Sequence, residues 1–295
     1  MSEPMNHRSG FVNILGNPNV GKSTLMNELT GEKLSIITSK SQTTRHRIMG
    51  IVNGDDFQIV YSDTPGILNP KYRLQEAMMN FVNSALSDAD LILYVTDVVE
   101  TVDKNADYLT KIIKTPVPKI IAINKIDLSS PEKLDALFDY WTELVPGAVV
   151  IPISALTRFN VDNLFKLILD KIPEGPAWFP KDQVTDRYER FFVTEIIREK
   201  ILLNYDKEIP YSVEVEVESF TDEPGITRIG AIIHAARDSQ KGIIIGHKGS
   251  RLKKVGTEAR RDIEELLGRK VFLELFVKVT KEWRDNNSAL KRFGY

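Results

Sequence analysis

The chain has 295 residues and contains no cysteine. This absence excludes disulfides, thiolate metal sites and cysteine nucleophiles, and it favours a reducing compartment. Only four histidines are present, widely scattered, so no histidine-based metal site is expected. No apolar run approaches the ~20 residues that span a bilayer, and the polar start of the chain lacks the apolar core of a secretion signal. We therefore expect a cytoplasmic protein.

Hydrophobic residues make up 42% of the chain, which is enough for a sizeable core. A length of roughly 150 residues per domain suggests two domains. Residues 173–180 hold three prolines, which cannot continue a helix, so the boundary is predicted there. We expect a flexible N-terminal tail over residues 1–9, a first domain over 10–172, a proline-rich linker over 173–180 and a second domain over 181–295.

The formal net charge of −2 is unevenly distributed along the chain. Residues 241–295 hold 14 lysines and arginines against 7 acidic residues, a net charge of +7. Residues 181–240 hold 8 against 13, a net charge of −5. The basic segment is a candidate polyanion-binding surface. A solvated helical face is the commoner cause of such a run, and both interpretations are kept.

Residues 16–23 fit the pattern G-x-x-x-x-G-K-[ST] of a phosphate-binding loop. A strand-like run over 11–15 precedes it and a helix-like run over 23–30 follows, which is the context the motif requires. The backbone N–H groups and the helix dipole would hold the phosphates, with Lys22 reaching the β and γ phosphates and the Ser23 hydroxyl binding Mg²⁺. The predicted contact residues are Asn17, Pro18, Asn19, Val20, Gly21, Lys22, Ser23 and Thr24.

Asp63-Thr64-Pro65-Gly66 directly follows a predicted strand. An Asp at a strand end opposite a phosphate loop is the expected place for a Mg²⁺ carboxylate, and the Gly66 N–H can meet a γ-phosphate. Alone, the four residues would indicate only a turn. The phosphate loop upstream favours the functional interpretation.

Asn124-Lys125-Ile126-Asp127 follows another predicted strand and indicates base selection. The Asp127 carboxylate can accept from N1–H and the exocyclic amino group of guanine, which adenine cannot match. The Lys125 stem can lie along the purine face. Backbone N–H groups of Ser154, Ala155 and Leu156 could bind the guanine O6, with Ser154 bracing the loop. A simple loop before the next helix is an equally open interpretation of Ser154-Ala155-Leu156.

Strands and helices alternate through the first domain, which predicts an α/β fold with a doubly wound, mostly parallel sheet. Its ligand would lie at the carboxyl ends of the strands. Asn53-Gly54 predicts one antiparallel hairpin, and Asp97 is expected to be only a turn residue. The expected strands are 11–15, 47–52, 57–61, 91–95, 119–123 and 148–152, and the expected helices are 23–30, 74–86, 103–113, 131–144 and 161–171.

The sequence predicts a smaller α+β fold for the second domain. A helix is expected over 186–203, then a strand in which valines alternate with Glu214, Glu216 and Glu218, giving an acidic outer face. Pro224-Gly225 turns the chain into a second strand. Gly246-His247-Lys248-Gly249 then precedes a helix that carries further basic residues. The candidate RNA-binding residues are Gly246, His247, Lys248, Gly249, Arg251, Lys253 and Lys254.

The order of these motifs resembles a Ras-like GTPase, and Gln42-Thr43-Thr44-Arg45-His46-Arg47 with the second domain resembles the Era family of bacterial ribosome-assembly GTPases. The resemblance implies a P-loop GTPase domain followed by a type II KH domain, so the run over 243–245 is expected to be a short helix rather than a strand. Thr44 would be the switch threonine that closes on Mg²⁺ and the γ-phosphate, with Thr43 as the fallback.

The same resemblance implies GTP and GDP as ligands and Mg²⁺ as cofactor. The partners would be the single-stranded 3′ end of small-subunit ribosomal RNA and the small ribosomal subunit. It also implies weak peripheral association with the inner membrane on its cytoplasmic face, and we expect a monomer. Lys22, Thr44, Gly66 and Asn19 are the candidate catalytic residues.

One departure from the Ras pattern concerns the residue after D-x-x-G. Ras-like enzymes carry a glutamine there that orients water, whereas this chain has Ile67. Slow intrinsic hydrolysis is therefore expected. Asn19 matches an asparagine that supports a potassium ion in some GTPases of this class, although it could equally only shape the turn.

Two other functions fit parts of the pattern. A signalling GTPase for protein or membrane partners would use the KH-like domain only as a structural platform, and it would show no salt-dependent RNA binding. An ATPase would need an adenine site, which Asp127 opposes.

Overall fold

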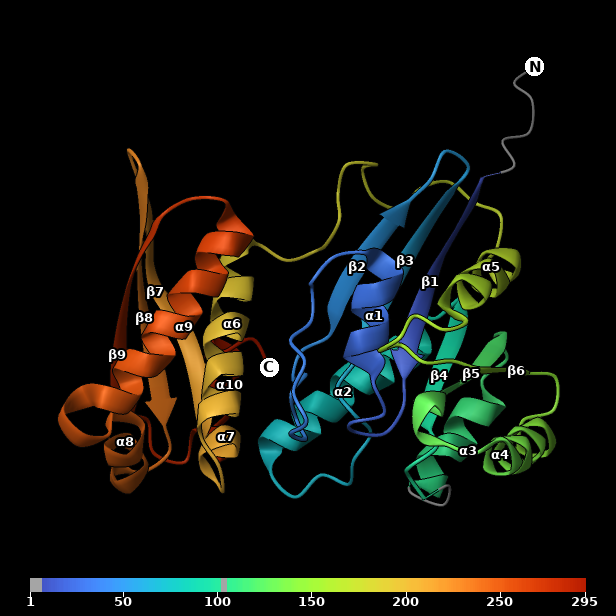
Figure 1. Ribbon diagram of the computed structural model, residues 1–295, viewed down its shortest axis with the longest axis horizontal. Coiled ribbons are helices and arrows are strands. Elements are labelled where there is room, and N and C mark those ends of the chain that lie inside the picture. Colours follow the sequence, from blue (N-terminus) through green and yellow to red (C-terminus); the bar gives the residue numbers. More distant parts are fainter. Residues whose placement is uncertain (1–6, 102–104) are drawn as a thin grey trace. The chain divides into compact units, whose positions relative to one another are not determined.

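The computed structural model describes residues 7–101 and 105–295, and its elements are labelled in Figure 1. The chain divides into two compact units. The first holds Met1–Ser35, Thr44–Pro70 and Met78–Asp186, and the second holds Ile36–Thr43, Lys71–Ala77 and Arg187–Tyr295. Two short stretches from the first half of the chain thus belong to the second unit. Among the described helices, none combines the length and the apolarity needed to cross a membrane.

The first unit is built on a six-stranded sheet with the order β2-β3-β1-β4-β5-β6. Only β2 and β3 pair antiparallel, through the hairpin predicted at Asn53-Gly54. The doubly wound, mostly parallel α/β fold is therefore confirmed. Its elements are β1 (Arg8–Leu15), α1 (Lys22–Thr30), β2 (Ile48–Asn53), β3 (Phe57–Asp63), α2 (Arg73–Ser87), β4 (Leu91–Asp97), α3 (Ala106–Lys114), β5 (Lys119–Asn124), α4 (Pro131–Leu144), β6 (Val149–Pro152) and α5 (Val161–Lys171).

Helices cover both faces of this sheet, which is why β4 is buried over its whole length. On one face, Ile92 and Tyr94 of β4 share a core with α2, α3 and α4. Leu91, Leu93 and Val95 point to the other face because side chains alternate along a strand, and they are fully buried as well. The helices α1 and α5, which contact each other, belong to this second layer (Figure 1). A continuous apolar strand is what a sheet covered on both faces requires.

The expected end of the N-terminal tail and the expected start of one helix differ from the structure by several residues. The expectation of a flexible tail over residues 1–9 is wrong for Arg8 and Ser9, because both pair with β3 and the Arg8 guanidinium donates to the carbonyl of Asp170 at 2.8 Å. Residues 1–6 of that tail lie outside the described residues. The helix expected over 103–113 corresponds to α3, and Asp103 likewise lies outside the described residues.

The second unit contains a three-stranded sheet in which β7 and β8 pair antiparallel and β8 and β9 pair parallel. The order helix, strand, strand, helix, helix, strand matches the smaller α+β domain expected from the sequence. The run over 243–245 ends α8, as the short-helix prediction required. The elements are α6 (Glu189–Asn204), α7 (Ile209–Ser212), β7 (Val213–Glu223), β8 (Ile226–Ala235), α8 (Asp238–Ile245), α9 (Ser250–Leu267), β9 (Val271–Val279) and α10 (Asn287–Arg292).

The acidic face of β7 is more covered than the alternation suggested. Glu214 is buried and accepts a hydrogen bond from the Tyr295 hydroxyl at 2.7 Å. Glu216 accepts from Arg292 Nε at 2.9 Å. These two glutamates are covered by α10 and the last residues of the chain. The sequence pattern did not reveal this short helix. Only part of this face is therefore a free acidic surface.

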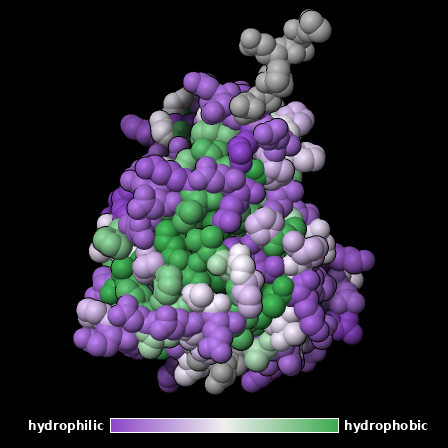
Figure 2. Space-filling view, turned by 90° about the vertical axis from the view of Figure 1, so that its right-hand side faces the viewer, coloured by the Kyte–Doolittle hydropathy of each residue, from purple (hydrophilic) through white to green (hydrophobic). Residues whose placement is uncertain are grey.

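Figure 2 shows one face of the molecule, on which hydrophobic residues gather in the middle and hydrophilic residues surround them. In the first unit, β6 forms one edge of the sheet, where Val149 and Val150 are only partly buried. Exposed large hydrophobic side chains of this unit include Leu128, Leu156 and Phe159. Such mixed surfaces are normal, because roughly 55–60% of the accessible surface of folded proteins is apolar.

Candidate nucleotide site and nucleic-acid groove

The loop between β1 and α1 has the shape that anion binding needs. Gly16 and Gly21 adopt φ values of 149° and 96°. A Cβ on Gly16 would lie 2.1 Å from the Val95 carbonyl oxygen, and one on Gly21 would lie 2.3 Å from Asn124 Nδ2. Within the described residues no side chain caps α1, so the N–H groups of its first turn remain available to an anion.

Lys22 begins α1 directly after this loop and is almost fully buried. Its Nζ donates to the carbonyl oxygen of Asn17 at 2.8 Å and to that of Gly16 at 3.1 Å. Burial lowers the pKa of Lys22 to about 8, against the opposing effect of Asp63 and Glu100. The ammonium is thus held at the mouth of the loop, where a phosphate would restore its full charge.

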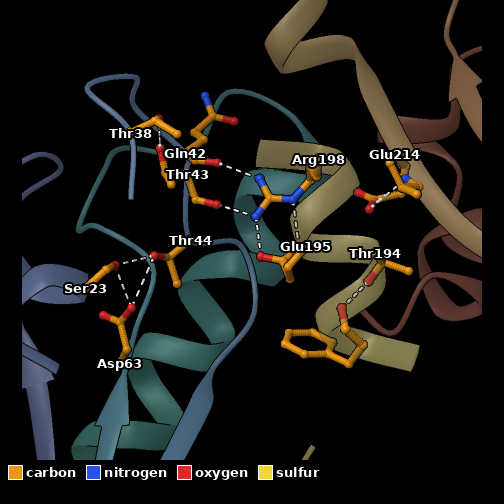
Figure 3. Close-up of polar contacts among 12 residues, drawn as sticks. Ser23, Thr38, Gln42, Thr43, Thr44, Asp63, Thr194, Glu195, Arg198 and Glu214 are labelled. Carbon is orange, nitrogen blue, oxygen red and sulfur yellow. Dashed lines mark hydrogen bonds and ion pairs between the residues drawn. The ribbon is translucent and has the colours of Figure 1, made fainter. Parts of the chain in front are cut away.

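Ser23, Thr44 and Asp63 meet beside the loop (Figure 3). Ser23 Oγ donates to Asp63 Oδ2 at 2.7 Å. Thr44 Oγ1 lies 2.9 Å from Ser23 Oγ and 3.3 Å from Asp63 Oδ2. Thr43, the fallback residue, instead bonds Thr38 and the Lys40 carbonyl. The structure therefore brings together the three residues predicted to hold the metal and leaves Thr43 outside the cluster.

The donor set of this cluster fits Mg²⁺. Burial raises the pKa of Asp63, although hydrogen bonds from Ser23 and Thr44 and the charge of Lys22 oppose the shift. Among the described residues, Asp63 Oδ1 has no hydrogen-bond partner although it is buried. A buried carboxylate oxygen beside two hydroxyls matches the all-oxygen coordination that Mg²⁺ prefers.

Gly66 and Ile67 differ sharply in their surroundings. A Cβ on Gly66 would lie 2.7 Å from the backbone of Pro18, so only glycine fits against the phosphate loop. The Ile67 N–H donates to the Gly16 carbonyl at 3.1 Å. Its side chain is buried in the core that α2, α3 and α4 share. Ile67 is therefore a packing residue and offers no polar group to a water molecule.

Asn124 ties the loops of the site together. Its Nδ2 donates to the Val20 carbonyl at 2.9 Å, and its Oδ1 accepts from the Ala155 N–H at 2.9 Å. The phosphate loop and the loop after β6 are thus fixed to the same side chain at the end of β5. This supports the expected neighbourhood of Asn124, Ala155 and the phosphate loop.

Asp127 and Ser154 also lie together. Ser154 Oγ donates to Asp127 Oδ1 at 2.6 Å and accepts from the Thr157 N–H at 3.3 Å. Ser154 is buried, whereas Asp127 and Leu156 are exposed. Ser154 therefore braces the loop, as one of the two sequence interpretations expected, and orients the carboxylate toward the surface.

Asp97 is more than the turn residue that the sequence suggested. Its Oδ2 pairs with Lys125 Nζ at 2.5 Å, and its Oδ1 accepts from the N–H groups of Val99 and Glu100. Lys125 also donates to the Asn19 carbonyl at 2.6 Å. Position alone could have flagged Asp97, because it ends a strand at the edge where the ligand binds.

Glu100 and Asn105 are further residues that the sequence prediction missed. Glu100 accepts from Asn17 Nδ2 at 2.7 Å and from Thr96 Oγ1 at 2.7 Å. Asn105 donates to Asn17 Oδ1 at 2.8 Å and to the Ile67 carbonyl at 2.9 Å. They lie beyond any of the nucleotide motifs, and no motif signalled their position. Together, Glu100 and Asn105 fix the side chain of Asn17, the first polar side chain of the phosphate loop.

In the second unit, the G-x-x-G loop joins α8 to α9. Gly246 and Gly249 adopt φ values of 72° and 77°, and Lys248 between them has a φ of 47°. His247 and Lys248 are both exposed. Beside the loop is a groove of about 420 Å³ between α9 and β9. Its lining residues are Gly249, Leu252, Lys253, Gly256, Thr257, Arg260, Val271, Phe272, Leu273 and Leu275.

Some of the predicted RNA-binding residues line this groove and others do not. Gly249 and Lys253 line it. Arg251 instead lies over the ring of Tyr205, with 6.0 Å from its guanidinium carbon to the ring centroid. Lys254 pairs with Glu258 at 3.9 Å and is not part of the lining.

Phe272 is a lining residue that the sequence prediction missed, whereas Arg260 is one of the basic residues that the sequence indicated on the helix after the G-x-x-G loop. Phe272 is 42% exposed, and the Arg228 guanidinium lies 5.0 Å from its ring centroid. An exposed aromatic ring beside basic side chains is a surface on which a nucleic-acid base can stack. The outward position of Phe272 within an alternating strand was the available signal.

Two family models match the chain. The family described as "50S ribosome-binding GTPase" matches residues 11–125. The family described as "KH domain" matches residues 208–284. The first match includes the phosphate loop, Asp63 and Asn124, and the second includes the G-x-x-G loop and its groove.

The chain is also similar over its whole length to curated relatives. It is 47% identical to GTPase Era of Geotalea daltonii, with 100% of both chains covered. It is 45% identical to GTPase Era of Ruminiclostridium cellulolyticum, with 99% of this chain and 98% of the relative covered.

Two solved structures share the architecture. A crystal structure of Era in complex with MgGDPNP and nucleotides 1506–1542 of 16S ribosomal RNA has a TM-score of 0.94 at 39% identity, covering 98% of this chain and 99% of its own. A variant of Aquifex aeolicus Era bound to GDP·AlF4⁻ has a TM-score of 0.94 at 40% identity, with the same coverage.

Proposed function

Because this chain belongs to the family of GTPase Era, we propose that it is a GTP-binding and GTP-hydrolysing switch that binds the 3′ end of 16S ribosomal RNA through its KH domain. Its role would be in the assembly and maturation of the small ribosomal subunit. The observation that carries the proposal is the full-length similarity to an Era solved with both MgGDPNP and a 16S ribosomal RNA fragment. The phosphate loop and the α9–β9 groove support the two halves of the proposal.

The nucleotide would bind through three groups of residues. Backbone N–H groups over 16–23 and Lys22 hold the phosphates, and Asp127 accepts from the guanine edge. Ser23, Thr44 and Asp63 would hold Mg²⁺, which supplies positive charge against the β and γ phosphates. The Gly66 N–H meets the γ-phosphate, so that loss of this phosphate releases the segments around Thr44 and Gly66.

Hydrolysis without help should be slow, because the buried Ile67 side chain cannot orient water. Asn19 is proposed to support a K⁺ ion that offsets charge on the phosphate oxygens. Its left-handed backbone, with a φ of 67°, equally fits a residue that only shapes the turn. The role of K⁺ is tested by measuring hydrolysis rates in potassium and sodium buffers of equal ionic strength. Faster turnover in potassium is expected, and equal rates would contradict a role for K⁺.

The domain bounds proposed for this function are a GTPase domain over 10–172, to which β1 adds Arg8 and Ser9, a linker over 173–180 and an RNA-binding domain over 181–295. Gln58 Oε1 accepts from the N–H groups of Trp178 and Phe179 at 2.7 and 2.9 Å, so this stretch is fastened to β3, and the first unit continues to Asp186. We also propose a cytoplasmic monomer with weak peripheral association at the inner membrane. Cell fractionation and light scattering test these points.

The proposed RNA binding is tested by replacing the two side chains between the glycines of the G-x-x-G loop, as His247→Asp with Lys248→Asp. RNA of the 16S 3′ end should no longer bind in a filter assay, while GDP affinity stays unchanged. Lys281→Asp with Lys291→Asp gives two lysine-to-acid changes at exposed positions of the same unit outside the groove lining, and serves as the control. Unchanged RNA affinity in the variant His247→Asp with Lys248→Asp would count against the proposal.

A salt series on the wild-type protein separates this function from that of a GTPase with a purely structural KH-like fold. Phosphate contacts release counterions, so log affinity should fall linearly with log salt concentration. Binding without salt dependence, or no binding, would favour the structural alternative.

A further inference from the structure

The G-x-x-G loop has a backbone that its surroundings must hold in place. Gly246, Lys248 and Gly249 adopt φ values of 72°, 47° and 77°. A left-handed conformation is unfavourable for a residue with a side chain such as Lys248, and it persists where neighbouring contacts impose it. The Gly246 N–H donates to the Gly242 carbonyl oxygen at 3.0 Å, and the Gly249 N–H donates to the Gly246 carbonyl oxygen at 3.2 Å. Contacts from side chains outside the loop add to these two bonds.

Tyr205 holds the end of α8, where the loop begins. It directly follows α6 and is only 2% exposed. The Tyr205 hydroxyl donates to the Ile244 carbonyl oxygen at 2.6 Å. Carbonyl groups in the last turn of a helix lack a partner within the helix, so this bond satisfies one of them. The phenol therefore fixes the chain two residues before Gly246.

Arg251 packs against the loop from the first turn of α9. A Cβ on Gly246 would lie 2.8 Å from Arg251 Cγ and 3.2 Å from Arg251 Cδ, so the stem of this arginine covers Gly246. Its guanidinium carbon lies 6.0 Å from the centroid of the Tyr205 ring, at the outer range of a cation–π contact. Burial raises the pKa of Tyr205 to about 12, and the charge of Arg251 opposes this rise. Arg251 therefore connects Gly246 with Tyr205.

Lys253 differs from Arg251, although both are exposed basic residues in the first turn of α9. Lys253 lines the groove between α9 and β9, and Arg251 is not part of that lining. A lysine in the lining is placed to contact a phosphate of a strand that lies in the groove. An arginine that packs on Gly246 and Tyr205 is placed to support the loop.

We propose that Tyr205 and Arg251 are positioning residues that hold the G-x-x-G loop in the conformation that receives the RNA backbone. Arg251 then contributes to RNA affinity through the loop and not as a phosphate contact, which revises its expected role. The inference rests on the proposed function, since it requires the loop to clamp single-stranded RNA. The apparent dissociation constant rises as the fraction of molecules in the binding conformation falls.

The first test compares Arg251→Met with Lys253→Met in a filter-binding assay with RNA of the 16S 3′ end over a salt series. Methionine keeps much of the unbranched stem but removes the charge. Arg251→Met should weaken binding about threefold at every salt concentration, as expected for a lost cation–π contact. The slope of log affinity against log salt concentration should stay at the wild-type value. Lys253→Met should reduce this slope by about 0.7, the value for one phosphate contact of a single strand.

Two results of this comparison would overturn the role given to Arg251. A slope reduced to the same extent in both variants would make Arg251 a phosphate contact like Lys253. Wild-type affinity in Arg251→Met would show that the loop does not depend on the guanidinium.

The second test uses Tyr205→Phe, which keeps the ring under Arg251 and removes only the hydroxyl. RNA affinity should fall about fivefold, as expected for the loss of one buried hydrogen bond, with the wild-type salt slope. Tyr295→Phe is the matched control, because it removes a hydroxyl that donates to Glu214 of β7 at 2.7 Å in the same unit. It should bind RNA as the wild type does. An equal loss of affinity in the two variants would contradict a specific role of Tyr205.

Amide hydrogen exchange without RNA tests the same role independently of RNA binding. The N–H groups of Gly246 and Gly249 should exchange faster in Tyr205→Phe than in the wild type, because the end of α8 is no longer held. The N–H of Ile233 in the central strand β8 should exchange at the wild-type rate. Wild-type exchange at both glycines, or an equal acceleration at Ile233, would contradict the proposal.

The RNA measurements also separate the positioning role from the proposed function. If the wild-type protein binds the RNA and both Tyr205→Phe and Arg251→Met bind it equally well, only the positioning role fails. If the wild-type protein does not bind the RNA, the proposed RNA-binding function fails and the positioning role with it.

Discussion

A single carboxylate, that of Asp97, holds Lys125 in place at the base end of the nucleotide site. Asp97 is buried, and its Oδ2 lies 2.5 Å from Lys125 Nζ. Lys125 adopts a left-handed backbone with a φ of 60°, so its position depends on side-chain contacts more than on regular structure. Asp97 therefore determines where the lysine stem lies relative to a bound base.

Asp97→Asn should raise the dissociation constant of GDP about tenfold. The amide oxygen can keep the bonds from Val99 and Glu100, but its NH₂ group would then face the ammonium of Lys125. Asp107→Asn, an exposed acid on α3, is the control. Equal GDP affinities for the wild type and Asp97→Asn, measured by titration of labelled nucleotide, would show that Lys125 does not need this partner.

Residues inside a fixed motif were predictable, and residues that support the motif were not. Ser23 and Asp63 came from spacing alone, because metal binding imposes residue types at set positions. Asp97 and Glu100 act through loop geometry, and several residue types could have made similar bonds. Their roles became visible only with their neighbours in place.

At the scale of elements, the pairing of α9 with β9 creates the groove beside the G-x-x-G loop. Gly256 on α9 faces Leu275 on β9, and a Cβ there would lie 3.3 Å from Leu275 Cδ1. The absent side chain keeps the two elements open to a ligand. Phe272 stands at this opening with an exposed ring.

Phe272→Ala should weaken binding of single-stranded RNA about 10- to 100-fold, because base stacking on an aromatic ring is worth roughly 1–3 kcal/mol. GTP hydrolysis in the absence of RNA should stay at the wild-type rate. Phe276→Ala is the matched control, since Phe276 is also exposed on β9 but does not line the groove. An equal effect of the two substitutions would contradict a specific stacking role.

The short helix α10 covers His234 of β8. His234 is fully buried, with Nδ1 2.8 Å from Thr280 Oγ1 and Nε2 3.0 Å from Glu216 Oε2. Burial lowers the pKa of His234, and Glu216 offsets only part of this shift. Arg292 on α10 and Lys278 on β9 also disfavour the charged form.

Stability should therefore depend on pH through His234. The unfolded chain takes up a proton near pH 6.5 while the folded chain resists it, so stability falls as the pH drops below about 6.5. His234→Gln should show a shallower loss than the wild type when denaturant midpoints are compared from pH 7.5 to pH 5. His247→Gln, which removes an exposed histidine, is the control. Parallel pH profiles for wild type and His234→Gln would contradict this account.

Elements with strong periodicity or continuous apolar runs were predicted well. The bounds expected for α4 and α5 are those observed. The strands β4 and β5 were predicted from continuous apolar runs, which are typical of a sheet covered on both faces. In contrast, α10 has only six residues and no clear apolar stripe, so nothing marked it in the sequence. The burial of Glu214 was missed for the same reason.

At the scale of the whole molecule, the grouping of the stretches 36–43 and 71–77 with residues 187–295 could not be predicted. Within this second unit, the Tyr72 hydroxyl donates to Gln42 Oε1 at 2.9 Å, and the Arg284 guanidinium lies 4.9 Å from the centroid of the Tyr72 ring. These bonds join residues that are far apart in sequence and follow no period. They explain why the stretches 36–43 and 71–77 group with the second unit, which linker composition does not indicate.

The most direct test of the account is a competition measurement with labelled GDP, Mg²⁺ and the intact protein. GTP should displace the label at concentrations about 10⁴-fold or more below those needed for ATP, because adenine would leave the Asp127 carboxylate without its donors. Displacement by ATP and GTP at similar concentrations would contradict a guanine-nucleotide switch.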